Sequence, residues 1–386
     1  MKPTNLLFLI LFLLTALMSR AQETGTFTCA AMNVDGMPKS IKVAGFYSVE
    51  LNPDAREAEG ATAVGKKIKS KGWDFFGVSE DFNYNNELTT QLTGYSQGTH
   101  RGGIPTSPGF DILGSFLAQK SPLFNTDGLN FFWNSKVTVS GERWQQWNTH
   151  YGYTNDGADG MIAKGYRMYQ VTVATGITLD VYILHMEAGA HEKDYASREA
   201  QYTQLANDIL NNNTGNSVIV MGDFNSHYTD DRLKELFVDP ILANSRFHLY
   251  DAWVLRNHSK VYPPYHGSSV AEEAIDKLFY INVDGGSCKL SITDYKIDTD
   301  FMDASGTPLS DHYPVVSSFK WTRQHYEPQY SLGDTNKDGV IDVSDVTTLI
   351  NMVLGSTSID KSVADMDGNG TVDVSDVTML INKILS

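Results

Sequence analysis

Two copies of one acidic pattern lie near the C-terminus of this sequence. The segment DTNKDGVIDVSD at residues 334–345 returns 31 positions later as DMDGNGTVDVSD at residues 365–376. Each copy places oxygen-bearing side chains at loop positions 1, 3, 5, 9 and 12 and glycine at position 6, which is EF-hand-type calcium spacing with Asp instead of Glu at position 12. The expected ligands of two Ca²⁺ ions are Asp334, Asn336, Asp338, Asp342 and Asp345, then Asp365, Asp367, Asn369, Asp373 and Asp376, together with the carbonyls of Val340 and Thr371.

Each acidic loop leads into a short apolar segment, VTTLINMVL or VTMLINKIL, with helical spacing. Two such helices can bury their apolar faces only against each other, so residues 333–386 are predicted to form a small all-α calcium-binding domain. A solvated acidic tail is the alternative, but it does not explain why Asp, Gly and apolar positions recur in register. The polar segment 322–332, which contains Pro328 and lacks periodicity, is predicted to be a linker.

The N-terminus has the organisation of a secretory signal peptide. Lys2 precedes the apolar run 6–18, and Ser19-Arg20-Ala21 ends it with small residues. We expect cleavage after Ala21, so that residues 1–21 are removed and the protein is secreted to the periplasm or the exterior. No later stretch approaches the roughly 18 apolar residues of a membrane-spanning helix, which predicts a mature protein without a transmembrane segment.

The two cysteines, Cys29 and Cys288, can pair in an exported protein. Cys29 lies inside an apolar strand-like run, and buried free thiols are common, which favours two unpaired cysteines.

The net charge of −16 is divided unevenly along the chain. Residues 326–386 hold ten acidic residues against three lysines, a net of −7, which leaves −9 to residues 1–325. An acidic main domain disfavours tight nonspecific binding of nucleic acid, because such binding neutralises phosphates with Lys and Arg. It does not exclude a nuclease whose bound metal supplies the positive charge.

Residues 22–321 alternate strand-like apolar runs with helical segments, which predicts a layered α/β domain. Some of the strands are expected to be antiparallel. The clearest strand-like runs are residues 26–34, 73–80, 165–173, 178–185, 217–223, 276–283 and 312–319, and the helical candidates are 57–71 and 197–212.

Polar residues stand where these strands end. In VIVMGDFNS (218–226), Asp223 and Asn225 are two residues apart, so an extended chain points both side chains the same way. A turn explains any one such residue, because Asp and Asn are favoured where strands stop. Eight of them at the ends of the principal strands indicate one pocket instead: Asn33, Glu80, His185, Asp223, Asn225, Asp276, Asp311 and His312.

This set of side chains suits hydrolysis of a phosphate ester. The oxygens of Asn33, Glu80 and Asp311 suit a hard cation such as Mg²⁺ or Mn²⁺. A His held by a carboxylate can deprotonate water, and a second His with an amide can hold a phosphate oxygen. Zinc is less suitable, because the set is rich in oxygen and the sequence has neither HExxH nor a Cys ligand pair.

The sequence resembles two known families. MNVDG (32–36), GVSED (77–81), HMEAG (185–189), GDFNS (222–226), IDKLFY (275–280) and SDHYPV (310–315) occur in the order of the endonuclease/exonuclease/phosphatase superfamily, over about residues 27–320. This superfamily includes deoxyribonucleases, inositol polyphosphate 5-phosphatases and neutral sphingomyelinases. The tandem of calcium loops resembles the dockerin domain, which attaches secreted enzymes to cohesin modules, and implies calcium-dependent docking to a cohesin-type partner.

The first resemblance implies a fold and a set of roles. The fold is a four-layer α/β sandwich, in which two packed β-sheets are flanked by helices. The sequence departs from the family at Ser79, where many members have Gln. The implied roles are metal binding by Asn33, Glu80 and Asp311, general base for His312, its orientation by Asp276, alignment of the nucleophile or assistance to the leaving group by Asp223, and phosphate binding by Asn225, His185 and Lys164.

The sequence leaves the substrate open between two enzymatic functions. KGY (164–166), HMEAG and the aromatic stretch 130–153 are more similar to the sphingomyelinase side of the family, which favours a phosphodiesterase or phosphatase acting on a lipid headgroup or another small phosphoester. The rings of Trp133, Trp144, Trp147, Tyr151 and Tyr153 either form a membrane-contacting surface or pack beneath a long hairpin. The alternative enzyme is an extracellular DNase-type endonuclease.

A third hypothesis is a non-catalytic binding protein displayed through the dockerin-like domain. It predicts loss of at least one of Glu80, Asp223, Asp311 and His312, and all four are present.

Overall fold

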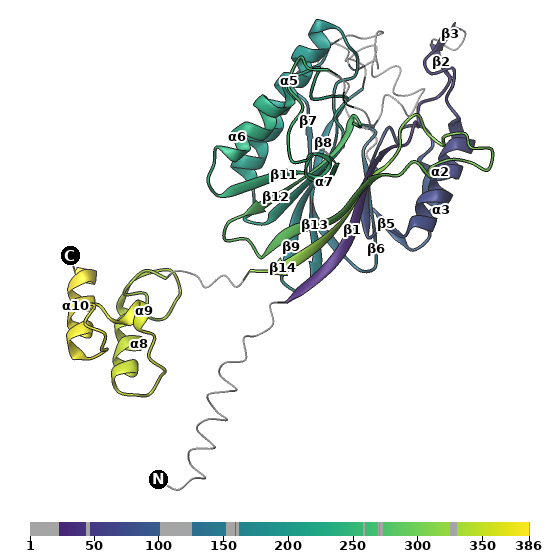
Figure 1. Ribbon diagram of the computed structural model, residues 1–386. Helices are drawn as coiled ribbons and strands as arrows, with labels where there is room; N and C mark the ends of the chain where they lie inside the picture. Colours follow the sequence, from purple (N-terminus) through teal and green to yellow (C-terminus); the bar gives the residue numbers. More distant parts are fainter. Residues whose placement is uncertain are drawn as a thin grey trace. The chain divides into compact units, whose positions relative to one another are not determined.

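The computed structural model describes residues 23–43, 47–100, 126–151, 159, 162–257, 259–268, 270, 273–324 and 330–385. The chain divides into two compact units, Met1–Gln324 and His325–Ser386. Both six-stranded sheets belong to the first unit, and the second unit is helical (Figure 1). The predicted signal peptide, residues 1–21, lies outside the described residues. Within them, no helix is both long enough and apolar enough to cross a bilayer.

The first sheet has the strand order β13-β14-β1-β4-β6-β5. Strand β1 is antiparallel to β14 and parallel to β4, with Asn33 level with Ser79. The ends of β1 and β4 therefore lie at the same edge as the start of β14. The strands are β1 (Thr24–Asn33), β4 (Phe75–Ser79), β5 (Tyr95–Gln97), β6 (Asn130–Asn134), β13 (Cys288–Ile297) and β14 (Val315–Arg323).

The second sheet has the strand order β11-β12-β10-β9-β8-β7. Strand β10 is parallel to β9 and antiparallel to β12, so Asp223 lies between His185 and Asp276 in register. The strands are β7 (Thr138–Gln146), β8 (Gly165–Ala174), β9 (Ile177–His185), β10 (Ser217–Asp223), β11 (Phe247–Asp251) and β12 (Asp276–Val283). A separate hairpin pairs β2 (Ser40–Val43) with β3 (Tyr47–Glu50).

Helices cover the outer faces of the two sheets and complete a four-layer α/β sandwich, which confirms the expected fold (Figure 1). Ala61, Val64 and Ile68 of α2 pack on Met32 and Phe76 of the first sheet. The helical segments beside the first sheet are α2 (Glu57–Lys71) and α3 (Asn85–Gln91). Those of the second half are α5 (Glu192–Asn212), the π-helical turn η3 (Lys234–Val238), α6 (Asp239–Leu242) and α7 (Ala252–Asn257).

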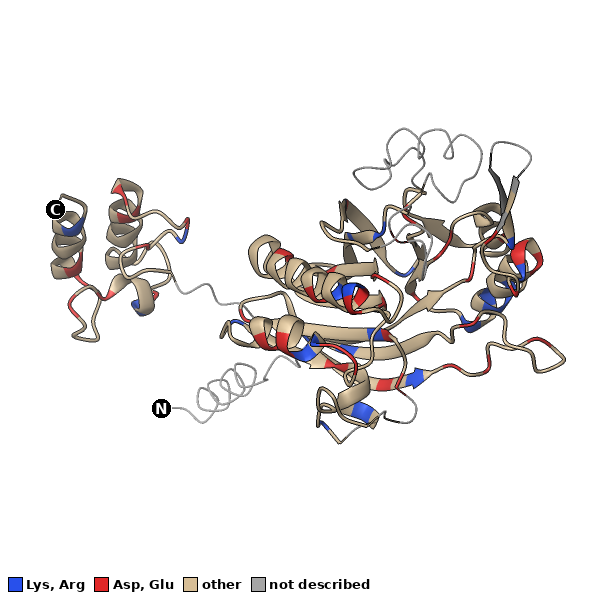
Figure 2. Ribbon diagram, turned by 90° about the horizontal axis from the view of Figure 1, so that it is seen from above, with Lys and Arg blue, Asp and Glu red and all other residues tan. Residues whose placement is uncertain are grey.

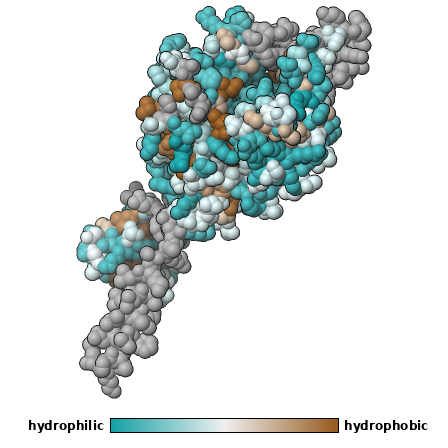
Figure 3. Space-filling view, turned by 45° about the vertical axis from the view of Figure 1, so that its right-hand side comes forward, coloured by the Kyte–Doolittle hydropathy of each residue, from teal (hydrophilic) through white to brown (hydrophobic). Residues whose placement is uncertain are grey.

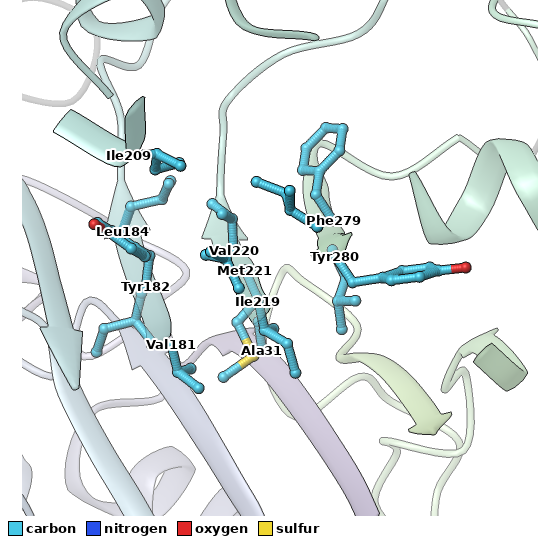
Figure 4. Packing of buried hydrophobic residues seen from close by; sticks show 14 of the residues in the cluster. Ala31, Val181, Tyr182, Leu184, Ile209, Ile219, Val220, Met221, Phe279 and Tyr280 are labelled. Carbon is cyan, nitrogen blue, oxygen red and sulfur yellow. The ribbon is translucent and has the colours of Figure 1, made fainter. Parts of the chain in front are cut away.

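The largest core lies between the sheets and extends under α5. All seven residues of β10 are buried, as a central strand covered on both faces requires. Figure 4 shows side chains of β9, β10 and β12 gathered with Ala31 of β1. The face of the molecule in Figure 3 is mainly hydrophilic, with hydrophobic side chains in small areas.

The second unit contains α8 (Val343–Val353), α9 (Lys361–Ala364) and α10 (Val374–Leu385). Leu349 and Met352 of α8 pack against Ala364 and Leu380, as the helical spacing of the two repeats predicts. Asp342 caps α8 by accepting a hydrogen bond from the backbone nitrogen of Ser344 at 2.7 Å.

The bounds of the helices and strands confirm some local predictions and correct others. Helix α2 spans the predicted 57–71, whereas α5 begins at Glu192, ahead of the predicted residue 197. Strand β14 begins at Val315, so Asp311 and His312 lie in the turn before the strand instead of opening it. The same strand continues to Arg323, within the segment predicted as linker. Cys29 and Cys288 are both free and buried, as expected.

Trp147 and Trp133 of the aromatic stretch pack inward. Trp147 is buried and its Nε1 donates to the carbonyl of His185 at 2.7 Å. Trp133 packs against the main core, and Trp144 and Tyr151 are half-buried. Tyr153 lies outside the described residues. These rings follow the hairpin-packing alternative more closely than a membrane-contacting surface.

Candidate active site

The predicted site residues meet at one edge of the sandwich. In the first sheet they end β1, follow β4 and precede β14, and in the second they stand at the ends of β9 and β10 and the start of β12. These are three adjacent strands in each sheet, so the topology brings six strand ends to one place.

His312 links two buried carboxylates of the second sheet. Its Nδ1 lies 2.5 Å from Oδ2 of Asp276, and its Nε2 lies 3.9 Å from Oδ2 of Asp223. Burial opposes the imidazolium, but Asp276 and Asp223 raise the pKa of His312 well above its ordinary value. The two carboxylates therefore favour the charged form of this imidazole.

The two carboxyl groups beside His312 differ in acidity. Burial raises the pKa of Asp276 to about 6, although His312 opposes this shift. Burial also disfavours the charged form of Asp223, but His312 and a hydrogen bond from Asn33 hold its pKa below the ordinary value. Asp223 is thus the more firmly ionised of the pair.

Asn33 joins the two sheets across the site. Its Nδ2 donates to Oε1 of Glu80 at 2.9 Å and to Oδ2 of Asp223 at 3.1 Å. In this arrangement the amide nitrogen faces the carboxylates, and Oδ1 accepts a hydrogen bond from the backbone of Asp35 at 3.0 Å. Its predicted role as a metal ligand stays a prediction.

His185 faces the same carboxylates from strand β9. Its Nε2 lies 3.5 Å from Oδ2 of Asp223 and 3.9 Å from Oε1 of Glu80. Burial and the nearby Lys164 hold its pKa well below the ordinary value. A neutral imidazole that donates one hydrogen bond is compatible with a phosphate oxygen.

Asn225 lies at the turn that follows β10, with φ of 50° in the left-handed region. Its backbone nitrogen donates to Oδ1 of Asp223 at 2.8 Å, and its Nδ2 donates to the carbonyl of Met186 at 3.1 Å. Asn and Asp tolerate this conformation better than most residues because their short side chains bond locally. Strand β10 therefore ends in a turn, and Asn225 of this turn is one of the candidate site residues.

Lys164 is buried beside the site but its charge is already partnered. Its Nζ forms an ion pair with Asp159 and donates to the Met186 carbonyl at 3.2 Å. The ammonium raises the acidity of Glu80 only as a secondary influence. A direct contact between Lys164 and phosphate stays a prediction.

Asp35 is a site residue that the sequence reasoning missed. Burial and the negative charge of Asp311 raise its pKa to about 6, and its φ is 49°. Gly36 follows it, and a Cβ there would overlap the carbonyl oxygen of Glu80. Asn33 and Asp35 have the same i, i+2 spacing that drew attention to Asp223 and Asn225, so the signal was present in MNVDG.

The oxygen set on the first sheet fits a divalent cation. Burial, together with Asp311, raises the pKa of Glu80 to about 7 although Asn33 and Lys164 oppose the shift. Among the described residues, no Lys or Arg forms an ion pair with Glu80, Asp35 or Asp311. Carboxylates without a neutralising side chain suit a hard cation. Among the described residues of the large unit, the ligand atoms that lie within 4.8 Å of one another are those of Asp223, Asp276 and His312, and the predicted set on the first sheet does not form such a group.

The two loops of the small unit have the same internal geometry. The position-12 residues Asp345 and Asp376 are fully buried, and each accepts a hydrogen bond from the backbone of position 9, at 2.9 Å and 2.8 Å. Asp334 and Asp365 accept from the position-6 glycines at 3.0 Å and 2.8 Å. Ligand oxygens of Asp365, Asp367 and Asp376 lie within 4.8 Å of one another. The ligand atoms of the second loop are therefore gathered as a small cation requires, and the first loop shares its hydrogen bonds.

Comparisons with known proteins match both units of the chain. Residues 332–385 match the dockerin type I domain. Over 313 residues the chain is 27% identical to sphingomyelinases of Mycobacterium bovis and Mycobacterium tuberculosis, an alignment that covers 77% of this chain and 53% of theirs. The chain thus spans about half the length of these relatives.

Two solved structures share the fold of the large unit. One is D. rerio TDP2 complexed with single strand DNA product, with a TM-score of 0.51 and 14% identity, covering 76% of this chain and 99% of that one. The other is the human Nocturnin catalytic domain with bound sulfate anion, with a TM-score of 0.50 and 16% identity, covering 78% and 98%. At these identities the likeness concerns the fold alone.

Proposed function

We propose that this chain, in which a domain of the endonuclease/exonuclease/phosphatase fold precedes a dockerin type I domain, is a secreted, divalent-metal-dependent phosphodiesterase. The observation that carries the proposal is the chain of contacts Asp276–His312–Asp223, at 2.5 Å and 3.9 Å, with the amide nitrogen of Asn33 bridging Asp223 to Oε1 of Glu80. A base oriented by one carboxylate and faced by another is suited to activating water.

The proposed mechanism assigns one task to each side chain. Asp276 orients the imidazole through Nδ1, so Nε2 of His312 is left to accept the proton of the attacking water. Asp223 aligns that water or assists the leaving group, and His185 and Asn225 hold phosphate oxygens.

Glu80 and Asp311, with Asp35 beside them, are the residues to hold Mg²⁺ or Mn²⁺. When bound, the cation supplies Lewis-acid stabilisation of charge on the phosphoryl group.

The proposed substrate is a lipid-headgroup phosphodiester of the sphingomyelin type. The 27% identity to sphingomyelinases supports this choice. In Figure 2 the Lys and Arg residues of the large unit are interspersed with Asp and Glu, whereas a long nucleic-acid strand favours a basic stripe.

The test is a substrate panel with Mg²⁺, with EDTA as a parallel arm. It contains sphingomyelin, phosphoinositides, single- and double-stranded DNA, RNA and a phosphomonoester. We expect release of phosphocholine from sphingomyelin to be fastest and to stop with EDTA. Faster cleavage of DNA would replace the headgroup assignment with a nuclease. Turnover of none of the substrates would contradict the proposal.

For the small unit we propose calcium-dependent docking to a cohesin-type protein. The match to the dockerin type I domain and the gathered carboxylates of Asp365, Asp367 and Asp376 support it. The enzyme would then act where its partner holds it, outside the cell.

A further inference from the structure

A buried ionic cluster lies directly beneath the proposed phosphate-binding loops. Arg198 of α5 and Asp231 are each 1% exposed, and Nε of Arg198 donates to Oδ2 of Asp231 at 3.0 Å. The hydroxyl of Tyr202 donates to the same oxygen at 3.0 Å. A buried ion pair is weak evidence for stability, because the desolvation of both charges offsets much of their attraction. Stability alone therefore does not explain why this ion pair is buried at this position.

The cluster connects two loops that are distant in sequence. On one side, Oδ1 of Asp231 accepts a hydrogen bond from the hydroxyl of Ser226 at 2.7 Å. On the other side, Nη1 of Arg198 donates to the carbonyls of Glu187 and Gly189 at 3.0 and 2.8 Å. Ser226 follows Asn225, and Glu187 follows His185 by two positions. One guanidinium–carboxylate pair thus anchors both loops that carry the proposed phosphate binders.

Asn225 needs such an anchor. Its backbone has φ of 50°, and its side chain spans to the Met186 carbonyl of the opposite loop at 3.1 Å. Strained turns persist where the surrounding structure over-determines them. Ser226 holds the residue after this turn, and Arg198 holds the residues after Met186, so the two loops cannot separate without breaking the cluster.

We infer that Arg198 and Asp231 are positioning residues, which fix the distance between His185 and Asn225 and thereby set the geometry of the phosphate site. This inference rests on the proposed phosphodiesterase function. Neither residue touches the reacting atoms. Because misplacement of a binding group by about 1 Å can cost roughly 100-fold in rate, the pair acts on turnover through its neighbours.

The test separates positioning from stability. The variants are Arg198→Met, Asp231→Leu, their combination and Ser226→Ala, assayed with a soluble chromogenic phosphodiester and Mg²⁺. Each single ionic variant leaves a buried charge unpaired and lowers the melting temperature, whereas the double variant replaces the pair with apolar groups and recovers much of it. We expect kcat to stay roughly 10- to 100-fold low in the double variant, as for other supporting residues around active sites.

The matched control is the ion pair of Arg143 with Asp208, which also involves α5, at 2.8 and 2.6 Å. Arg143 donates hydrogen bonds to Asp208 and to the hydroxyl of Tyr182, neither of which belongs to the two loops. Arg143→Met is expected to lower stability with less than a twofold change in kcat. A double Arg198/Asp231 variant with recovered stability and wild-type kcat would overturn the inference.

A second readout distinguishes this inference from the proposed function. Inorganic phosphate binding is measured by calorimetry for each variant and for the wild type. If the wild type binds phosphate but cleaves no ester, the proposed reaction is contradicted. The positioning role is then still tested, because it predicts weaker phosphate binding in the double variant and in Ser226→Ala. If the wild type does not bind phosphate, both are overturned.

Discussion

The Nδ1 atom of His312 lies 2.5 Å from Oδ2 of Asp276, although the two residues are 36 positions apart. One stands in the turn before β14 of the first sheet, and the other opens β12 of the second. The contact therefore exists only because the two sheets pack with these strand ends at the same edge.

Replacement of His312 by Ala removes the group proposed to accept the proton of water. We expect turnover of a phosphodiester to fall by about 10²- to 10⁴-fold, the usual contribution of a general base, while the circular dichroism spectrum stays that of the wild type. Asp276→Asn is expected to lower kcat as well, because the ring loses its orienting carboxylate. A near-normal rate in His312→Ala would remove His312 from this role.

Chelation tests the metal dependence of the proposed reaction. We expect EDTA to abolish hydrolysis, and Mg²⁺ or Mn²⁺ to restore it. Glu80→Gln is expected to raise the half-saturating Mg²⁺ concentration by at least tenfold, because it removes a charged oxygen from the cluster with Asp311. Glu235→Gln, on the surface of the same unit, serves as the control with unchanged metal dependence. Hydrolysis insensitive to EDTA would count against the mechanism.

Calcium is expected to stabilise the small unit. We predict that Ca²⁺ raises the melting temperature of a fragment spanning residues 326–386. The ion neutralises the buried carboxylates of Asp345 and Asp376 and the other acidic side chains of their loops. Asp334→Ala and Asp365→Ala should each reduce the shift, whereas Asn351→Ala, exposed on α8, should not. Identical melting curves with calcium and with chelator would reject the docking-domain assignment.

Glu187 predicts a specific pH dependence of stability. Burial and the charge of Asp159 raise its pKa from 4.5 to about 8. Between these two values the folded state keeps a proton that the unfolded state has released, so the contribution of Glu187 falls as pH rises and levels off above about 8. In denaturant titrations from pH 4.5 to 8.5, Glu187→Gln should therefore lose less stability than the wild type.

The control for this slope is Glu192→Gln, which is exposed at the start of α5 and should retain the wild-type pH dependence. A Glu187→Gln variant with an unchanged slope would show that another group is responsible.

Features whose determinants are close in sequence were predictable. Each position-12 aspartate bonds within the calcium loop that the sequence spacing identifies. This is predictable because all ligands of one loop lie within one short segment. The apolar periodicity of residues 57–71 predicts α2, and the polar ends of the apolar runs predict the edge at which the site lies. In these cases local backbone geometry decides which side chains point to the same side of an element or loop.

Other features depend on contacts between distant elements. Asp35 stands one position after a predicted strand, and its i, i+2 spacing from Asn33 does not show that it lies near Asp311, which follows it by 276 positions. Arg198 and Asp231 are 33 positions apart, and no periodicity connects them. The sequence of the aromatic stretch is compatible with a surface, whereas in the fold Trp147 is buried and bonded to the His185 carbonyl.

The sequence by itself thus determined the two domains, the strand ends and the chemical types of the site residues, because these follow from local pattern and composition. The tertiary structure decided which carboxylate contacts His312, which cation is already paired and which buried ion pair joins the loops after β9 and β10. Such contacts depend on how the two sheets pack and on which side chains are buried together. Burial raises the free-energy cost of each unpaired charge, and it is a property of the whole fold.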